Sequence, residues 1–384
     1  VVEEVAPGVV GGLHALQRER VVELVVERHP APEAEHAHLH ACVAEAPVLH
    51  LVVRNCHAVD GTPNDSESSE PGQKLTTCPT SVDPMRAAPG PPADVDVDED
   101  LVRNLLERQH RDLASLPISL HAEGWDNVLF RLGDELLVRL PRRAAAAELV
   151  TNESTWLPRL APRLPLAVPV PIRTGRPSDV YPWAWTIVPW FDGRPVGGGS
   201  LADPRRAAAA MGSFLAALHR PAPPNAPTNP LRGVPLADRQ TAFDERCAQL
   251  TSEVDVDRVR RAFQRSVRAP AWSGPPTWLH GDLHPHNVLE RDGEIVAVID
   301  FGDITAGDPA CDLMVAWSLF GPHERTIFRH AADSPERPID DAMWERGRGW
   351  AIAHSVALVA AGDDSSWHTA VGQHTLASAV DLAT

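Results

Sequence analysis

Apolar residues recur along the chain with two periods, and the change from one to the other divides it into two parts. Between residues 118 and 188 they come mostly as short runs bounded by Gly, Pro, Asp and Asn, which is typical of strands. From about residue 204 they recur every three or four residues, as on the buried face of a helix. The pattern predicts a small β-rich part followed by a larger helical part.

The β-rich part is predicted to hold a small sheet with one helix inserted after its third strand. Gly133 and Asp134, between two apolar runs, indicate a two-residue hairpin. The predicted strands cover 118–121, 128–132, 135–140, a short piece near 168–172, and 183–188, and the predicted helices cover 101–114 and 144–157.

The helical part is interrupted once. Helices are predicted over 204–219, 238–251, 256–268, 311–320, 340–361 and about 365–380. Between them, residues 278–301 lose the helical period and form a loop followed by a hairpin, whose turn contains Asp292 and Gly293.

The first 84 residues lack this regularity and end in a polar, linker-like stretch. His36, His38 and His40 alternate as on one face of a strand and could hold Zn²⁺ or Ni²⁺. The other interpretation is a disordered extension, or sequence upstream of a start at Met85. We treat residues 1–94 as an N-terminal extension that is poorly ordered or not native.

Composition excludes some classes of protein. The net charge of -17 disfavours a protein that coats nucleic acid, because phosphate backbones repel it. The chain has no run of about 18 apolar residues, so no membrane span is predicted. The five cysteines are scattered, and the chain starts without a signal peptide, so a cytoplasmic location is expected.

The strongest chemical signal is the segment HGDLHPHNVL, residues 280–289, followed by VIDFGD, residues 298–303. The predicted hairpin between them folds Asn287 back towards Asp300. An amide oxygen and a carboxylate together form a hard oxygen site that suits Mg²⁺. Phosphoryl transfer needs such a metal, and also a carboxylate that orients the attacking hydroxyl, for which Asp282 is placed.

A rival chemistry is metal-dependent hydrolysis, since His280, Asp282, His284 and His286 alternate as in a zinc site. That interpretation leaves Asn287 and the hairpin unexplained. His280 is expected to pack the loop, and Asp312 to hydrogen-bond it.

These motifs, with GDPACDL at 307–313, resemble the aminoglycoside phosphotransferase family, which includes macrolide and choline kinase-like enzymes. The resemblance covers about residues 99–384. It implies an α+β, protein-kinase-like fold of two lobes. Residues 95–190 would form the β-rich, nucleotide-binding N-lobe, and residues 191–384 the mainly helical C-lobe with the catalytic loop and the substrate site.

The resemblance also implies a role for single residues. Asp282 corresponds to the catalytic base, and Asn287 and Asp300 to the Mg²⁺ ligands. Asp303 and Asp308 are candidate substrate contacts, although Asp303, just past the metal ligand, could face either a cationic substrate or solvent. The residues implied in nucleotide binding are Asn127, Arg139, Glu153, Val188 and Trp190. Since Pro189 has no N–H, Val188 or Trp190 is expected to donate to the base.

Arg139 stands where the family normally has a lysine. Lys74 is the only lysine in the chain, so the region from 85 onward can offer only arginine to a phosphate. A guanidinium keeps its charge and grips phosphate, although its fork is bulkier than an ammonium group. We therefore expect Arg139 to replace the lysine in an active enzyme.

The expected function is ATP- or GTP-dependent O-phosphorylation of a small molecule, which can be cationic. The first candidate for this acceptor is an antibiotic of the aminoglycoside or macrolide type. The alternatives are a metabolic kinase for choline, an amino alcohol or a sugar amine, and a nucleotide-binding regulatory pseudokinase. Neither nucleic acid nor a membrane is expected as a partner. The sequence does not decide between a monomer and a homodimer.

Overall fold

The structure is a computed structural model that describes residues 92–198, 201–251, 254–335, 337–362 and 367–380. The proposed histidine metal site at 36–40 lies outside these residues, as does nearly all of the predicted extension. Among the described residues, no helix has both the length and the apolar character to cross a membrane.

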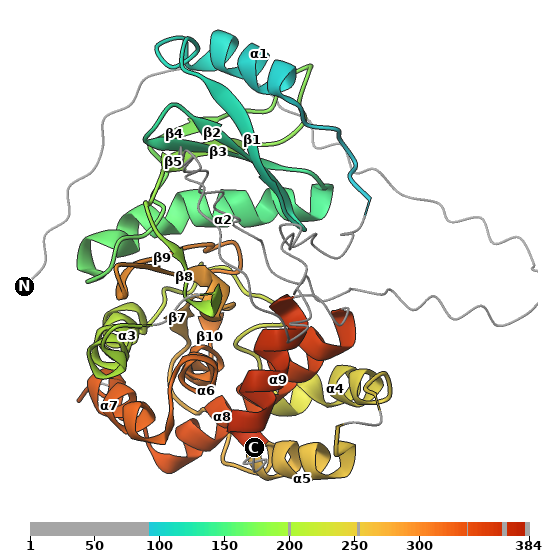
Figure 1. Cartoon of the computed structure of the whole chain (residues 1–384), viewed down its shortest axis with the longest axis vertical. Coiled ribbons are helices and arrows are strands. Elements are labelled where there is room, and N and C mark those ends of the chain that lie inside the picture. Colours follow the sequence, from blue (N-terminus) through green and yellow to red (C-terminus); the bar gives the residue numbers. More distant parts are fainter. Residues whose placement is uncertain (1–91, 199–200, 252–253, 336, 363–366, 381–384) are drawn as a thin grey trace, which may run out of the picture. The chain divides into compact units, whose positions relative to one another are not determined.

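The N-lobe is built on a five-stranded antiparallel sheet with the strand order β1-β2-β3-β5-β4 (Figure 1). Its strands are β1 (Ile118–Glu123), β2 (Asn127–Leu132), β3 (Leu136–Pro141), β4 (Arg173–Gly175) and β5 (Trp185–Pro189). Its helices are α1 (Glu99–Gln109) and α2 (Ala144–Leu160), followed by a 3₁₀ turn, η1 (Ala161–Arg163). One face of the sheet packs Phe130, Val138 and Ile187 against the apolar side of α1.

Local sequence explains these elements and their differences from the prediction. Gly133, with φ 59°, begins the β2–β3 turn, and because β3 starts at Leu136 the loop has three residues instead of two. The strand predicted near 168–172 forms at Arg173–Gly175 instead. Pro169 and Pro171 have no N–H to donate to a ladder, and pairing starts where Ile172 N donates to Ile187 O at 2.8 Å.

The C-lobe is mainly helical. Its helices are α3 (Pro204–Leu218), α4 (Gln240–Cys247), α5 (Val256–Val267), α6 (Val315–Leu319), α7 (Pro322–Ala332), α8 (Asp341–Ala361) and α9 (Trp367–Val380). Its short 3₁₀ segments are η2 (Val196–Gly198), η3 (Leu236–Arg239), η4 (Pro285–Asn287) and η5 (Pro309–Met314). The pattern did not predict α7, because only Phe328 and Ala332 of this helix are buried.

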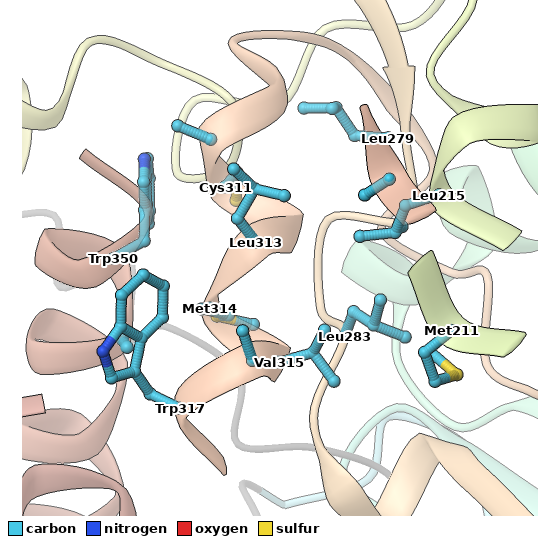
Figure 2. Packing of buried hydrophobic residues seen from close by; sticks show 14 of the residues in the cluster. Met211, Leu215, Leu279, Leu283, Cys311, Leu313, Met314, Val315, Trp317 and Trp350 are labelled. Atoms are coloured by element: carbon cyan, nitrogen blue, oxygen red, sulfur yellow. The ribbon is translucent and has the colours of Figure 1, made fainter. Parts of the chain in front are cut away.

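The C-lobe core surrounds the segment that carries the chemical motifs. Leu279 and Leu283, on either side of Asp282, are buried together with residues of α3, η5, α6 and α8 (Figure 2). Their burial fixes the backbone of the loop between them, since packed interiors leave little room for movement.

Two small antiparallel sheets complete the C-lobe: β6-β8-β9 and β10-β7. Their strands are β6 (Arg194–Pro195), β7 (Thr277–Leu279), β8 (Val288–Arg291), β9 (Glu294–Val298) and β10 (Thr305–Gly307). Asp292 and Gly293, at φ 55° and 79°, form the predicted turn between β8 and β9 with Arg291 paired to Glu294. Positive φ at both central residues is the geometry of a type I′ hairpin.

Candidate active site

A short loop, residues 280–287, joins β7 to β8 and carries the motif. Asp312, fully buried, accepts hydrogen bonds from the backbone N–H groups of His280 at 2.8 Å and Gly281 at 2.9 Å. A third contact joins Asp312 Oδ2 to Nε2 of His219, the residue that follows α3, at 3.0 Å. Burial alone would raise the pKa of Asp312, but the bond from His219 and the neighbouring donors lower it. The anchoring role predicted for Asp312 is confirmed.

His280 packs the loop from inside, as predicted. Its Nδ1 accepts from the N–H of Asp282 at 3.2 Å, so its Nε2 carries the proton and donates to Ile299 O at 2.9 Å. Both ring nitrogens of His280 are therefore engaged, one by Asp282 and one by Ile299, and His280 is fully buried. This leaves no lone pair for the hydrolytic metal site considered from the sequence.

Replacing Asp312 by alanine should lower the free energy of unfolding by about 3 kcal/mol, because two buried backbone N–H groups lose their acceptor. The Asp312→Asn variant keeps one acceptor oxygen and should lose less. Urea unfolding at pH 7 measures both. A loss below about 0.5 kcal/mol for the alanine variant, the level of an ordinary surface substitution, would contradict the anchoring role.

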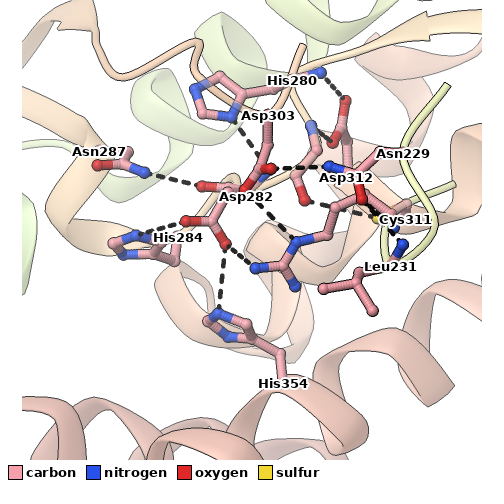
Figure 3. A network of polar contacts seen from close by, with 12 residues as sticks. Asn229, Leu231, His280, Asp282, His284, Asn287, Asp303, Cys311, Asp312 and His354 are labelled. Atoms are coloured by element: carbon pink, nitrogen blue, oxygen red, sulfur yellow. Dashed lines mark hydrogen bonds and ion pairs between the residues drawn. The ribbon is translucent and has the colours of Figure 1, made fainter. Parts of the chain in front are cut away.

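Asp282 lies at the centre of a polar cluster and is 5% exposed (Figure 3). Its Oδ1 accepts from Arg232 Nη2 at 2.9 Å. His354 Nε2 is 3.6 Å from Oδ1, and His284 Nε2 is 3.6 Å from Oδ2. Burial by itself would raise the pKa of Asp282, but the charge of Arg232 and the two histidines hold it well below its usual range. The carboxylate is therefore ionised and able to accept a hydrogen bond from a hydroxyl.

The β8–β9 hairpin brings Asn287 and Asp300 together as the spacing predicted. Ile299 N, next to Asp300, donates to Asn287 O at 2.9 Å. The Asn287 amide donates to Asp282 O at 2.9 Å, and its Oδ1 is buried without a hydrogen-bond partner. A buried acceptor without a donor is costly unless a cation or another ligand approaches it.

Asp300 has φ 62°, in the left-handed region that strains most residues. Burial raises its pKa to about 7; Arg139 opposes this shift, and the carboxylates of Glu153 and Asp282 add to it. The carboxylates of Glu153 and Asp282 near Asp300 create a negative potential that favours a bound cation.

These residues fit Mg²⁺. The orphaned Oδ1 of Asn287 and the Asp300 carboxylate are hard oxygen ligands. Within the described part of the chain, no group of three His, Cys, Asp or Glu residues could hold a metal alone. A metal with two protein ligands that is completed by phosphate and water is the usual arrangement for Mg²⁺ in phosphoryl-transfer sites.

The expected pair on the N-lobe is present. Arg139, on β3, donates through Nη1 to both carboxylate oxygens of Glu153, on α2, at 2.6 and 2.7 Å. Its Nη2 is 3.4 Å from Asp300 Oδ1, so the pair reaches the proposed metal ligand across the lobes. Both members are about 3% exposed, which excludes a plain surface salt bridge.

An apolar cleft lies beside this pair. Its walls are formed by Leu129, Leu137, Arg139, Pro169, Val188, Pro189, Trp190, Phe191, Leu289, Ile299 and Asp300. Val188 and Trp190 therefore both line the cleft. The N–H of Trp190, however, donates to Glu135 O at 2.7 Å, and its ring packs under Arg131, with 3.8 Å between guanidinium and ring centroid. Trp190 is thus not available as the backbone donor that was expected.

The sequence interpretation missed the backbone groups that are available. Leu137 pairs with Val188, and Trp190 N–H points to Glu135, so the backbone groups of Val188 and Trp190 face β3. By the same alternation, the C=O of Pro189, the last residue of β5, faces away from β3. The missing N–H of Pro189 was visible in the sequence, but the direction of the groups follows only from the register.

The two expected substrate contacts, Asp303 and Asp308, lie in different environments. Asp303 is partly exposed and accepts from Asn229 Nδ2 at 2.7 Å, close to Asp282. Asp308 is instead buried: Arg346 Nε donates to it at 2.7 Å, and it caps η5 through Ala310 N at 3.0 Å. Its expected role as a substrate contact is therefore replaced by a structural one.

Asn127 begins β2 and is 5% exposed, with its Oδ1 buried and without a hydrogen-bond partner. The turn before it ends in Asp126, which is paired with Arg143. Burial raises the pKa of Asp126 against the charge of Arg143, and Asp282 adds to the rise. The Asp126 carboxylate therefore lies within electrostatic range of Asp282.

Comparisons with known proteins agree with this geometry. The chain matches 99% of the GDP and kanamycin complex of APH(2")-IIia and 99% of the GDP complex of wild-type aminoglycoside 2'-phosphotransferase-IIIa, over 73% and 74% of its own length. Both have a TM-score of 0.56 at 18% identity, which shows a shared fold. A stretch of 54 residues is 33% identical to the uncharacterized protein YcbJ of Bacillus subtilis (strain 168) and spans 18% of that relative.

The model of the phosphotransferase enzyme family matches residues 117–350, more than half of the chain. This range contains the N-lobe sheet, the catalytic loop, both proposed metal ligands and the loop anchor. The protein-kinase-like two-lobe fold and the predicted resemblance are confirmed. The chain belongs to the phosphotransferase enzyme family.

Proposed function

We propose that the protein transfers the γ-phosphate of ATP or GTP to a hydroxyl group of a small molecule. The observation that carries this proposal is the convergence of three polar side chains on one point: Asp282, Asn287 and Asp300. A pseudokinase would not need all three. Family membership and the GDP complexes of the structural relatives support a nucleotide as the donor.

Asp282 orients the acceptor hydroxyl and accepts its proton as the new P–O bond forms. Its pKa is low, so it is a weak base, but orientation and charge stabilisation account for most of the catalysis in phosphoryl transfer. Asn287 and Asp300 would hold Mg²⁺. When bound, this metal neutralises the charge of the transferred phosphoryl group.

The cleft beside Val188 accommodates the nucleotide base between apolar side chains of both lobes, such as Leu137 above and Leu289 below. The C=O of Pro189 and the N–H of Phe191, two residues that line this cleft, are proposed to recognise its edge. Arg139, held by Glu153, contacts the phosphates. Asn127 and its turn close over them.

Replacing Arg139 by methionine should cost about 3–5 kcal/mol of unfolding free energy, because Glu153 would remain buried without its counter-charge. Nucleotide affinity should fall as well. Arg139→Lys keeps one charge and should retain most of the stability and measurable nucleotide binding. Urea unfolding and titration with a fluorescent nucleotide check both variants. Unchanged stability of the methionine variant would contradict the role of this buried pair.

The acceptor is proposed to be an antibiotic of the aminoglycoside or macrolide type. Kanamycin is named in a complex of one structural relative, which makes it the first compound to test. The sequence motifs fit a metabolic kinase for choline, an amino alcohol or a sugar amine equally well. Asp303 is proposed to meet the acceptor, which its contact with Arg232, the partner of Asp282, supports.

A screen of acceptors tests the proposal. The full chain is incubated with Mg²⁺ and ATP or GTP, together with kanamycin, other aminoglycosides, macrolides, choline and amino sugars, and the products are analysed by mass spectrometry. The proposal predicts addition of one phosphoryl group to at least one acceptor, with loss of the reaction in EDTA. A protein that binds nucleotide but modifies no acceptor in the panel would favour the regulatory alternative.

A further inference from the structure

A buried arginine from a loop without any motif reaches the catalytic carboxylate. Arg232 lies between α3 and η3 and is 6% exposed. Its Nη2 donates to Asp282 Oδ1 at 2.9 Å, and its Nε is 3.7 Å from Asp303 Oδ2. One guanidinium therefore bridges the catalytic residue and the carboxylate that is placed to meet the acceptor.

The loop that carries Arg232 is fixed on both sides. Before it, Asn229 Oδ1 accepts the N–H groups of Leu231 at 2.8 Å and Arg232 at 3.2 Å, while Asn229 Nδ2 donates to Asp303 (Figure 3). After it, Gly233 adopts φ 67°, and its C=O accepts from Asp308 N at 2.8 Å. These bonds hold the guanidinium at one place relative to the catalytic loop.

Because Arg232 contacts only one of the two carboxylate oxygens of Asp282, the two oxygens have different environments. Oδ1 accepts a hydrogen bond from Arg232 at 2.9 Å, whereas Oδ2 lies 3.6 Å from His284 Nε2, too far for a hydrogen bond. An ionised carboxylate oxygen has two acceptor positions. Oδ2 therefore has free capacity for a hydroxyl, and rotation of the carboxylate that would exchange the two oxygens is opposed by Arg232.

We infer that Arg232 is a positioning residue, which holds the carboxylate of Asp282 so that Oδ2 faces the acceptor hydroxyl. This role rests on the proposed phosphotransfer. Lysine at this position could not reproduce this geometry, because its three N–H donors share one nitrogen, whereas Arg232 contacts the two carboxylates through separate atoms, Nη2 and Nε. The geometry of the guanidinium group, and not its charge alone, therefore positions the carboxylate of Asp282.

Kinetics of Arg232→Met and Arg232→Lys test the inference, with Mg²⁺–GTP or Mg²⁺–ATP as donor. Kanamycin is the acceptor, and a macrolide, choline or amino sugar that the acceptor screen finds to be phosphorylated replaces it if kanamycin is not. The methionine variant should lose roughly 10²-fold in kcat, the effect expected for a small misplacement of a catalytic group, without a change in nucleotide Kd. The lysine variant should fall between methionine and wild type.

Arg346→Met is the matched control. Arg346 also forms a buried pair with an aspartate, Asp308, at 2.7 Å, but it does not contact Asp282. Its loss should lower Tm and leave kcat close to wild type. If Arg232→Met does not fold, Arg232→Lys decides the question through its kcat at unchanged nucleotide Kd.

The outcomes separate the two claims. An active wild type whose Arg232→Lys and folded Arg232→Met variants keep its kcat would overturn the positioning role and leave the proposed function standing. A wild type that phosphorylates neither kanamycin nor any other acceptor of the panel would remove the proposed function, and the positioning role with it. A fall in kcat for both Arg232 variants, with Arg346→Met unaffected, supports both claims.

Discussion

Replacing Asp282 by asparagine should lower turnover roughly 10²- to 10⁴-fold, the usual contribution of a positioned general base. The amide cannot take the proton of the acceptor hydroxyl. It also presents an N–H₂ group either to that hydroxyl or to Arg232, which donates to Oδ1 in the wild type. Steady-state kinetics with the acceptor found by the screen measures the loss.

Nucleotide binding should survive this substitution, because Asp282 does not line the apolar cleft. Asp341→Asn is the matched control: Asp341 has a carboxylate side chain that is 97% exposed, and its loss should leave turnover unchanged. An Asp282→Asn variant that retains wild-type kcat would show that another residue orients the hydroxyl.

Replacing Asp300 by asparagine should lower turnover roughly 10³-fold, since the metal contributes several kcal/mol of charge stabilisation. The carboxylate is expected to be a direct ligand, and an amide would compete poorly for Mg²⁺. Raising the Mg²⁺ concentration should restore part of the activity. The readouts are the apparent Kd of Mg²⁺ in the presence of nucleotide, and kcat at saturating metal.

Asp300 should also make the affinity for Mg²⁺ depend on pH. In the absence of metal, the pKa of Asp300 is raised to about 7, so near and below pH 7 a proton competes with Mg²⁺ for the carboxylate. The affinity for Mg²⁺ should therefore increase as the pH rises from about 6 to 8, and the Asp300→Asn variant should lose this dependence. Equal Mg²⁺ affinity at both pH values in the wild type would contradict the assignment.

The site was largely predictable because its residues are close in sequence. The segment from His280 to Asp300 is one loop and one hairpin, and the Asp-Gly turn fixes the register that returns Asp300 to Asn287. The Arg139–Glu153 pair was implied by the family resemblance, and local geometry alone did not predict it.

Contacts that arise only in the tertiary structure were not predictable. Arg232 belongs to a proline-rich stretch without apolar periodicity, and nothing local indicates that it contacts a residue 50 positions away. Asp308 was misassigned because its partner, Arg346, comes from a distant helix. Helix α7 buries too few apolar residues to produce a periodic signal, and it is stabilised by its packing against α3.

The most direct test of the account follows the γ-phosphate itself. The full chain and its Asp282→Asn variant are incubated with Mg²⁺ and γ-labelled ATP or GTP together with kanamycin, a macrolide or choline, and label is counted in the small-molecule product. The account predicts label in the product of at least one acceptor with the wild type and a severe loss with the variant. Equal label with both proteins, or label released only as inorganic phosphate with every acceptor, would contradict it.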